Sequence, residues 1–175
     1  MKKKFALLFL FVMGLTIETG NENVFANSKV TTPYYEDHSV RVGYKTVDEA
    51  VSEFEKNCDC VVKLPAMIPD LKFTHEFGAY YKDHKDRQKD LLQIRFVNRE
   101  QKNNIFKIDV RPSKVSYEGK EYTLQDGSKG IYVEHHIFHV FVFEKNNLQY
   151  IVRIDKNASD IDPSKVLMDV ANSVN

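Results

Sequence analysis

The stretch that decides the fold is residues 104–111, Asn-Ile-Phe-Lys-Ile-Asp-Val-Arg. Apolar and charged side chains alternate along it, which is the period of a β-strand with one buried face. We predict that the inward side chains are Phe106, Ile108 and Val110, and that the outward ones are Lys107, Asp109 and Arg111. Pro112 ends this strand because proline cannot donate to the ladder.

Further short runs of the same kind lie on both sides of this strand. The predicted strands are residues 71–81, 91–98, 114–117, 121–124, 131–133, 137–143 and 148–154. Gly78 marks a bulge or a close approach of two backbones in the first of them, and residues 126–130 form a turn. Short, turn-linked strands with one polar face predict a curved antiparallel sheet of about six to eight strands, connected as a meander.

A helix is predicted at each end of the sheet. Thr46 and Glu49 form a capping box, and apolar residues follow at helical spacing as far as about Lys56. Asp162 and Pro163 open the second helix, whose apolar face is Val166, Leu167, Val170 and Val174. The fold class is therefore α+β, with an N-terminal and a C-terminal helix packed on the sheet.

The segment between the first helix and the sheet contains two prolines, Pro65 and Pro69. Prolines at this spacing exclude both a helix and a central strand. We expect residues 61–69 to cross the domain in an extended form, with Leu64, Met67 and Ile68 packed on it.

The N-terminus has the pattern of a signal peptide. Three lysines precede the uncharged apolar run Phe5–Ile17, and Val24-Phe25-Ala26 matches the small-residue rule of signal peptidase. The alternative, a membrane anchor, is disfavoured because a spanning helix needs about 20 apolar residues. We expect cleavage between Ala26 and Asn27, which removes residues 1–26 and places the protein outside the membrane, secreted or in the cell envelope.

The remaining chain suits one domain. We expect residues 27–45 to be a flexible lead-in and residues 46–175 to form a single, monomeric α+β domain. The full chain has 25 Lys and Arg against 25 Asp and Glu. This balance argues against a nucleic-acid partner. Aspartates interrupt the one basic cluster after the signal sequence, which is Lys82, Lys85, Arg87 and Lys89.

The two cysteines, Cys58 and Cys60, are separated only by Asp59. In an extended chain their α-carbons lie at the limit of what a disulfide tolerates, about 7 Å apart. Free thiols are therefore the favoured expectation, and a bridge formed across a turn is the alternative. A redox or metal function that uses these two cysteines stays open, although the spacing differs from that of common dithiol motifs.

No residue pattern indicates catalysis. His135, His136 and His139 lie in a segment with strand character, where adjacent residues point to opposite faces and residues four apart are about 13 Å apart. One ion cannot bridge such positions, so we expect no metal site and no cofactor. Nucleophile and phosphate-loop motifs are also missing, and we expect no enzymatic activity.

Tyrosines on a curved sheet can line a groove, since each combines an apolar ring with a polar tip. Tyr80, Tyr81, Tyr122 and Tyr132 are the candidate binding residues. Ordinary packing between strands is the alternative explanation for them.

The chain also resembles a known family. Thr46–Ala50, Val62–Pro69, Phe141–Phe143, Asn147–Tyr150 and Val170–Val174 are similar to an uncharacterised extracytoplasmic domain family of Gram-positive bacteria, which also forms the outer part of anti-sigma factors. That family is similar to the half-barrel domains of lipoprotein carriers and sigma-factor regulators. The resemblance implies a bent sheet, a helical lid and an apolar cavity. Residues 58–60 depart from the family, whose members commonly have a glycine-aromatic pair there.

Together these features predict a non-enzymatic binding or sensor module. Its expected ligand is an apolar molecule, a lipid moiety or a peptide, held on the concave face of the sheet. A regulator that docks on an envelope protein and has no ligand cavity is the alternative. A filled concave face would count against the first hypothesis, and an exposed apolar patch would support the second.

Overall fold

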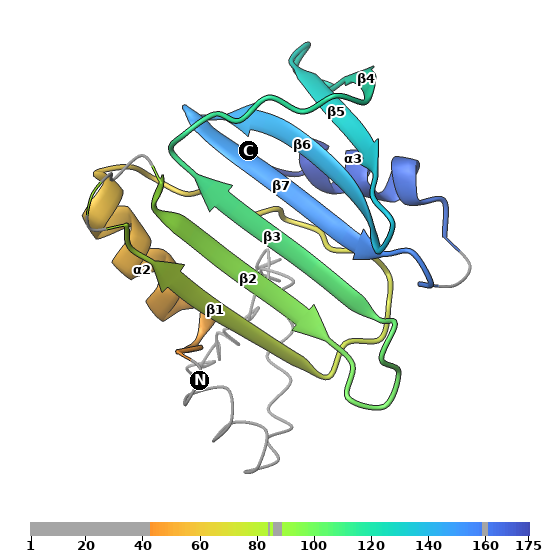
Figure 1. The fold of residues 1–175 in the computed structure, drawn as a ribbon, viewed down its shortest axis with the longest axis horizontal. Helices are drawn as coiled ribbons and strands as arrows, with labels where there is room; N and C mark the ends of the chain where they lie inside the picture. The colour runs from red at the N-terminus through yellow and green to blue at the C-terminus, as the bar shows by residue number, and fades with distance from the viewer. Residues whose placement is uncertain (1–42, 84, 86–88, 159–160) are drawn as a thin grey trace, which may run out of the picture.

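In the part of the chain that the structure describes, seven antiparallel strands form one twisted sheet, and two helices pack against one of its faces (Figure 1). The computed structural model describes residues 43–83, 85, 89–158 and 161–175. The elements are α2 (Val47–Cys58), β1 (His75–Tyr81), β2 (Leu91–Val97), β3 (Ile105–Arg111), β4 (Lys120–Thr123), β5 (Lys129–Glu134), β6 (Phe138–Lys145), β7 (Leu148–Asp155) and α3 (Pro163–Asn172). The expected α+β class is confirmed.

The strand order differs from the single meander that we predicted. The order across the sheet is β1-β2-β3-β7-β6-β5-β4, so the sheet consists of two meanders that meet where β3 pairs with β7. Residues 112–119 connect the two and carry the chain from the centre of the sheet to its far edge, as Figure 1 shows. Alternation in a sequence tells which face a side chain takes, but it does not tell which strands are neighbours.

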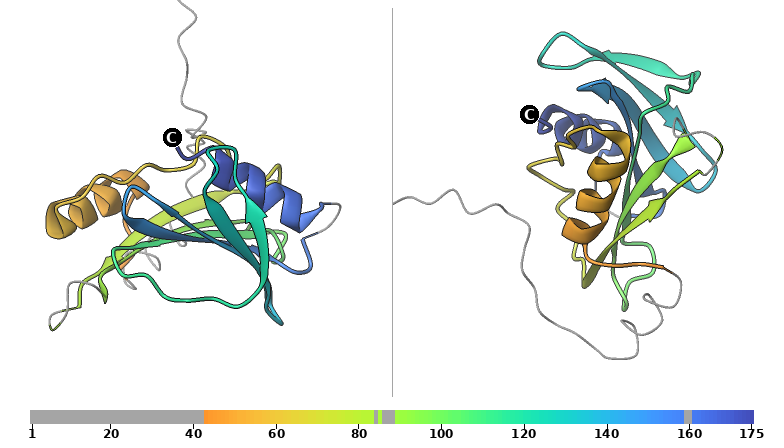
Figure 2. Two further views of the ribbon diagram at one scale, coloured as in Figure 1. Left: turned by 90° about the horizontal axis from the view of Figure 1, so that it is seen from above. Right: turned by 90° about the vertical axis from the view of Figure 1, so that its left-hand side faces the viewer.

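The face that carries both helices, here called the inner face, holds the main core (Figure 2). The inward residues that we predicted for β3 all belong to it, as do Leu92, Ile94 and Phe96 of β2. Leu92, Ile94, Phe106 and Val110 have no exposed surface. β6 and β7 add Phe141, Phe143, Leu148, Tyr150, Val152 and Ile154 to the same core. Side chains and helices therefore fill the middle of the inner face.

Helix α2 begins with the capping box that the sequence predicted. The Thr46 side chain accepts a hydrogen bond from the Glu49 backbone, and the Glu49 carboxylate accepts one from the Thr46 backbone. The helix lies directly on β1 at Gly78. A Cβ added to this glycine would be only 2.5 Å from the Ala50 Cβ and 2.8 Å from the Thr46 carbonyl oxygen. Gly78 is thus a close-approach point, and β1 runs past it in continuous register without a bulge.

The proline-containing segment crosses the inner face between the two helices. The Lys63 N–H donates to the Tyr150 hydroxyl at 3.2 Å, and the Ala66 N–H donates to the Ser173 carbonyl at 3.2 Å. Pro65 is buried, whereas Met67 is 49% exposed. The expectation that Met67 packs on the core is therefore wrong. The Ala66 and Met67 N–H groups both donate to Ser173 at the end of α3, and the Met67 side chain points outward.

On the opposite, outer face, the connection 112–119 lies over β6 and β7. Val115 exchanges two hydrogen bonds with the Gln149 side chain, at 3.1 and 2.8 Å, and Tyr117 packs on Val140 and Ile151. Residues 114–117 were predicted as a strand, but they form none, because their backbone pairs with a side chain instead of a ladder.

Asp109 points to the outer face, as predicted, but it is only 5% exposed. Its carboxylate accepts hydrogen bonds from Arg95 on β2, at 2.9 Å, and from Arg153 on β7. The outward direction of Asp109 is therefore as predicted, but arginines from both neighbouring strands cover its carboxylate.

The part of the lead-in that the structure describes is attached to the sheet. The Lys45 and Gly78 backbones exchange two hydrogen bonds of 2.8 Å, and the Tyr44 ring packs on Phe77 at 5.6 Å. These contacts hold residues 44 and 45 against β1. Residues 27–42 lie outside the described residues.

Candidate functional site

A groove lies at the end of the inner face, between the β4–β5 hairpin and the first turn of α3. Helix α3 packs on β6 and β7, so the inner side of the hairpin is less covered than the rest of this face. The groove has a volume of about 590 Å³. We call it the tyrosine groove, and its principal side chains are Tyr122, Tyr132, Glu134, His139, Asp162 and Ser164.

Strand register brings these side chains to one face. Tyr122 pairs with Gly130, Tyr132 pairs with Phe141, and Glu134 pairs with His139, so all of them point inward. Gly130 matters here because a Cβ at this position would collide with the Phe141 ring. The Phe141 ring therefore occupies the space above Gly130 and packs on Tyr122 at 6.1 Å.

Tyr132 and His139 form the floor of the groove. The Tyr132 hydroxyl and His139 Nδ1 lie 2.6 Å apart and share a hydrogen bond, and the two rings stack with an interplanar angle of 16°. Burial raises the pKa of Tyr132 to about 12, and the Glu134 carboxylate adds to this effect. Burial also lowers the pKa of His139, although Glu134 opposes the shift. Both side chains are therefore held in their neutral forms near neutral pH.

Tyr122 forms the wall beside this floor. The Tyr122 ring meets the Tyr132 ring edge to face, with centroids 6.3 Å apart. The Lys120 ammonium lies 4.9 Å from the centroid of the Tyr122 ring. Hydrogen bonding to Lys120 and then to Ser164 lowers the pKa of the Tyr122 phenol. The wall thus has both an aromatic face and a polar tip that reaches α3.

The N-terminus of α3 closes the other side of the groove. Asp162 caps the helix, and its Oδ1 accepts from the Ser164 N–H at 3.1 Å, the Lys165 N–H at 3.2 Å and the Ser164 hydroxyl at 2.9 Å. The Lys165 N–H is the main cause of the lowered pKa of this carboxyl. Phenol, imidazole, hydroxyl and carboxylate groups therefore converge on one space, which suits a ligand with hydrogen-bonding groups better than a hydrocarbon chain.

Of the four predicted tyrosines, Tyr122 and Tyr132 lie in the groove and the other two lie elsewhere. The Tyr80 hydroxyl donates to the buried Asp90 at 2.6 Å, and its ring packs on Phe54 under α2. Tyr81 is on the outer face and is 44% exposed. The expectation that all four share one binding surface is therefore wrong, because Tyr80 and Tyr81 are adjacent on a strand and point to opposite faces.

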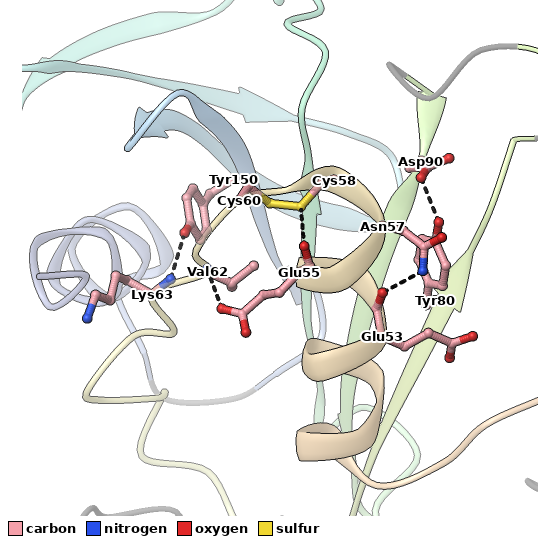
Figure 3. Close-up of a disulfide and its surroundings, with 10 residues drawn as sticks. All are labelled: Glu53, Glu55, Asn57, Cys58, Cys60, Val62, Lys63, Tyr80, Asp90 and Tyr150. Carbon is pink, nitrogen blue, oxygen red and sulfur yellow. Dashed lines mark hydrogen bonds between the residues drawn. A yellow bond between two sulfur atoms is a disulfide. The ribbon is translucent and has the colours of Figure 1, made fainter.

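The structure contains a Cys58–Cys60 disulfide, so the alternative that we disfavoured is the one found (Figure 3). Asp59 adopts a left-handed conformation with φ 55° and ψ 47°, and this turn shortens the Cα–Cα distance to 5.2 Å. The assumption of an extended chain had made a bridge difficult. The bonded sulfurs also have no thiolate with which to ligate a metal.

The disulfide lies where α2 passes into the crossing segment. The Glu55 carboxylate accepts from the Val62 N–H at 2.8 Å, and the neighbouring Lys63 N–H donates to Tyr150 (Figure 3). The disulfide, the Glu55 contact and the Tyr150 contact thus fix the direction in which the chain leaves the helix.

The three histidines are arranged differently from our expectation. His135 and His136 lie in the turn between β5 and β6, and their ring centroids are 4.0 Å apart, so the prediction that they point to opposite faces is wrong. His139 is in β6 and faces the groove. Among the described residues, no group of three or more His, Cys, Asp or Glu side chains is placed to hold a metal ion.

Reasoning from the sequence missed His139, Glu134 and Ser164 as groove residues. Glu134 could have been found, because it lies two residues after Tyr132 and shares its face. His139 depends on the register of the β5–β6 hairpin, and Ser164 depends on where α3 docks, so neither has a local signal.

No helix within the described part of the chain is both long and apolar enough to cross a membrane. The predicted signal sequence and its cleavage position at Ala26 and Asn27 lie outside the described residues. No family model, no curated protein and no solved structure matches this chain. The family resemblance noted from the sequence therefore stays a prediction.

Proposed function

We propose that this protein is an extracytoplasmic, non-enzymatic binding module that holds a peptide segment of a partner in the tyrosine groove. The observation that carries the proposal is the contrast within the inner face. Its centre is filled by side chains with no exposed surface, such as Phe141 and Tyr150, whereas its end is an open space of about 590 Å³. A ligand therefore has room at the end of this face and not at its centre.

The chemistry of the groove favours a peptide over a lipid among the ligands expected from the sequence. A lipid chain needs a continuous apolar surface. The groove instead presents the Tyr122 hydroxyl, the Ser164 hydroxyl and the Glu134 carboxylate beside its aromatic rings. Rings next to hydrogen-bonding groups suit an amide backbone with side chains of mixed polarity.

The edge of the sheet offers a way for such a peptide to bind. β4 is the terminal strand in the sheet order, so no described strand pairs with its second edge. An extended peptide can add to an exposed edge through main-chain hydrogen bonds, and its alternate side chains then take alternate faces. Lys120 and Tyr122 of β4 face inward, and the inward side chains of an added strand would enter the groove beside them.

The test is a titration of the isotope-labelled protein with a panel of short capped peptides, followed by amide NMR. We expect peptides that bind to shift the amides of β4 and of the first turn of α3. The variant Tyr122→Ala should weaken binding about tenfold or more, as for a central aromatic contact. Tyr81→Ala is the matched control, since it removes an exposed tyrosine from the outer face. Shifts confined to the outer face, or equal losses for both variants, would refute the proposal.

A further inference from the structure

The rim of the tyrosine groove is acidic, and this charge narrows the class of ligand. Among the described residues that line the groove, three exposed carboxylates, those of Glu118, Glu134 and Asp162, outnumber the one ammonium, that of Lys120. On this basis we infer that the groove takes a lysine or arginine side chain of the bound peptide. The inference rests on the proposed function, because it names the ligand chemistry of the same site.

The carboxylates belong to three different elements. Glu118 precedes β4, Glu134 ends β5, and Asp162 caps α3, so they surround the groove instead of lining one side of it. Asp162 is engaged with the helix backbone, and Glu134 has a loose ion pair with Lys156 at 3.8 Å. Glu118 and Glu134 therefore carry most of the attraction that remains for an incoming cation.

The aromatic wall provides a second reason for a cation. The faces of tyrosine rings attract ammonium and guanidinium groups within about 6 Å of the centroid. The Lys120 ammonium already lies 4.9 Å from the centroid of Tyr122, so the protein itself places a cation against this ring. Lys120 is exposed, and lysine has a flexible four-carbon stem, so its ammonium can move away when a ligand cation takes its place.

The same arrangement disfavours an anionic ligand. A phosphate or carboxylate group in the groove would face three carboxylates, and the capping Asp162 already occupies the N–H groups at the start of α3. The neutral His139 carries no charge to compensate for an anion. Charge complementarity therefore commits the site to a basic side chain.

The experiment compares three capped octapeptides built from serine, threonine and valine, with lysine, glutamine or glutamate at the centre. Binding is measured by calorimetry and by amide NMR at low salt, where charge effects are largest. We expect the lysine peptide to bind about tenfold more tightly than the glutamine peptide and the glutamate peptide to bind least. The lysine preference should weaken as salt is added.

Variants then locate the effect. Glu118→Gln and Glu134→Gln should each weaken the lysine peptide about threefold and leave the glutamine peptide unchanged. Lys120→Met should strengthen the lysine peptide by a similar factor, because it removes the competing cation. Glu121→Gln is the control, since Glu121 lies on the outer face of the same strand and pairs with Lys129 at 2.8 Å.

Two results would overturn the inference, and they differ from failure of the proposed function. If the lysine and glutamine peptides bind the groove equally, or if Glu121→Gln has the same effect as Glu134→Gln, the groove does not select a basic side chain, although it still binds peptides. If none of the three peptides shifts the amides of β4 or α3, both the inference and the proposed function are wrong.

Discussion

The contact between α2 and β1 predicts a large effect from the smallest substitution, Gly78→Ala. The added Cβ would lie 2.5 Å from the Ala50 Cβ, 2.8 Å from the Thr46 carbonyl oxygen and 3.0 Å from the Val47 Cα. Carbon atoms in contact prefer separations of about 3.5–4.0 Å, so the overlap is about 1 Å. Two of the three neighbours are backbone atoms of the first turn of α2, and they cannot rotate away. The helix must therefore move off the strand.

Overpacking of this kind costs about 1–3 kcal/mol, and the backbone neighbours place Gly78→Ala near the upper end. Replacing glycine in a strand returns up to about 1 kcal/mol because the unfolded chain loses freedom. The expected net loss in the free energy of unfolding is about 2 kcal/mol. Urea unfolding followed by far-UV circular dichroism measures it, since the chain has no tryptophan.

Two further variants make the test specific. Glu76→Ala changes an exposed residue of the same strand and should alter stability by less than about 0.5 kcal/mol. Combining Gly78→Ala with Ala50→Gly removes the closest of the three contacts, so the two substitutions should be less harmful together than the sum of their separate effects. If Gly78→Ala leaves the free energy of unfolding unchanged or raises it, or if the effects of Gly78→Ala and Ala50→Gly simply add, the close approach does not exist as described.

Three more predictions concern other parts of the molecule. Replacing Cys58 and Cys60 together by serine should lower the free energy of unfolding by about 1.5 kcal/mol, the chain-entropy value for so short a loop, and a loss above about 3 kcal/mol in urea unfolding would contradict this entropic account. Asp109→Asn should cost about 3 kcal/mol by the same assay, since it leaves two largely covered arginines without their carboxylate, and a loss below about 0.5 kcal/mol would contradict it. His139 has a lowered pKa in the folded state, so the unfolded chain takes up the proton first as the pH falls below about 6.5. Between about pH 7 and pH 5 the wild type should therefore lose more stability than His139→Gln, and equal losses would show that the burial of His139 does not control this titration.

Much of the local structure could be predicted because its causes are local. The capping box of Thr46 and Glu49 and the inward residues Phe106 and Ile108 are determined by a few neighbouring residues. The strand order was not predictable in this way, since the pairing of β3 with β7 depends on residues about forty positions apart. The Cys58–Cys60 disulfide was misjudged for a different reason. It depends on the left-handed conformation of Asp59, which is usually signalled in a sequence by glycine and not by aspartate.

In the candidate site, too, some features follow from the local sequence and others depend on residues that are far apart in the chain. Tyr122 and Tyr132 were identified from residue type, but their separation from Tyr80 and Tyr81 follows from strand order and from the positions of the helices. β4 and β5 extend the inner face past the part that α3 covers, and there the half-buried Tyr122 and the buried Tyr132 both line the groove. The groove is thus a consequence of placing a hairpin at the far edge of the sheet. No described strand pairs with the second edge of β4, so the strand that presents Lys120 and Tyr122 to a ligand also offers it a backbone edge. Recognition of side chains and of main chain can then take place at one position on the molecule.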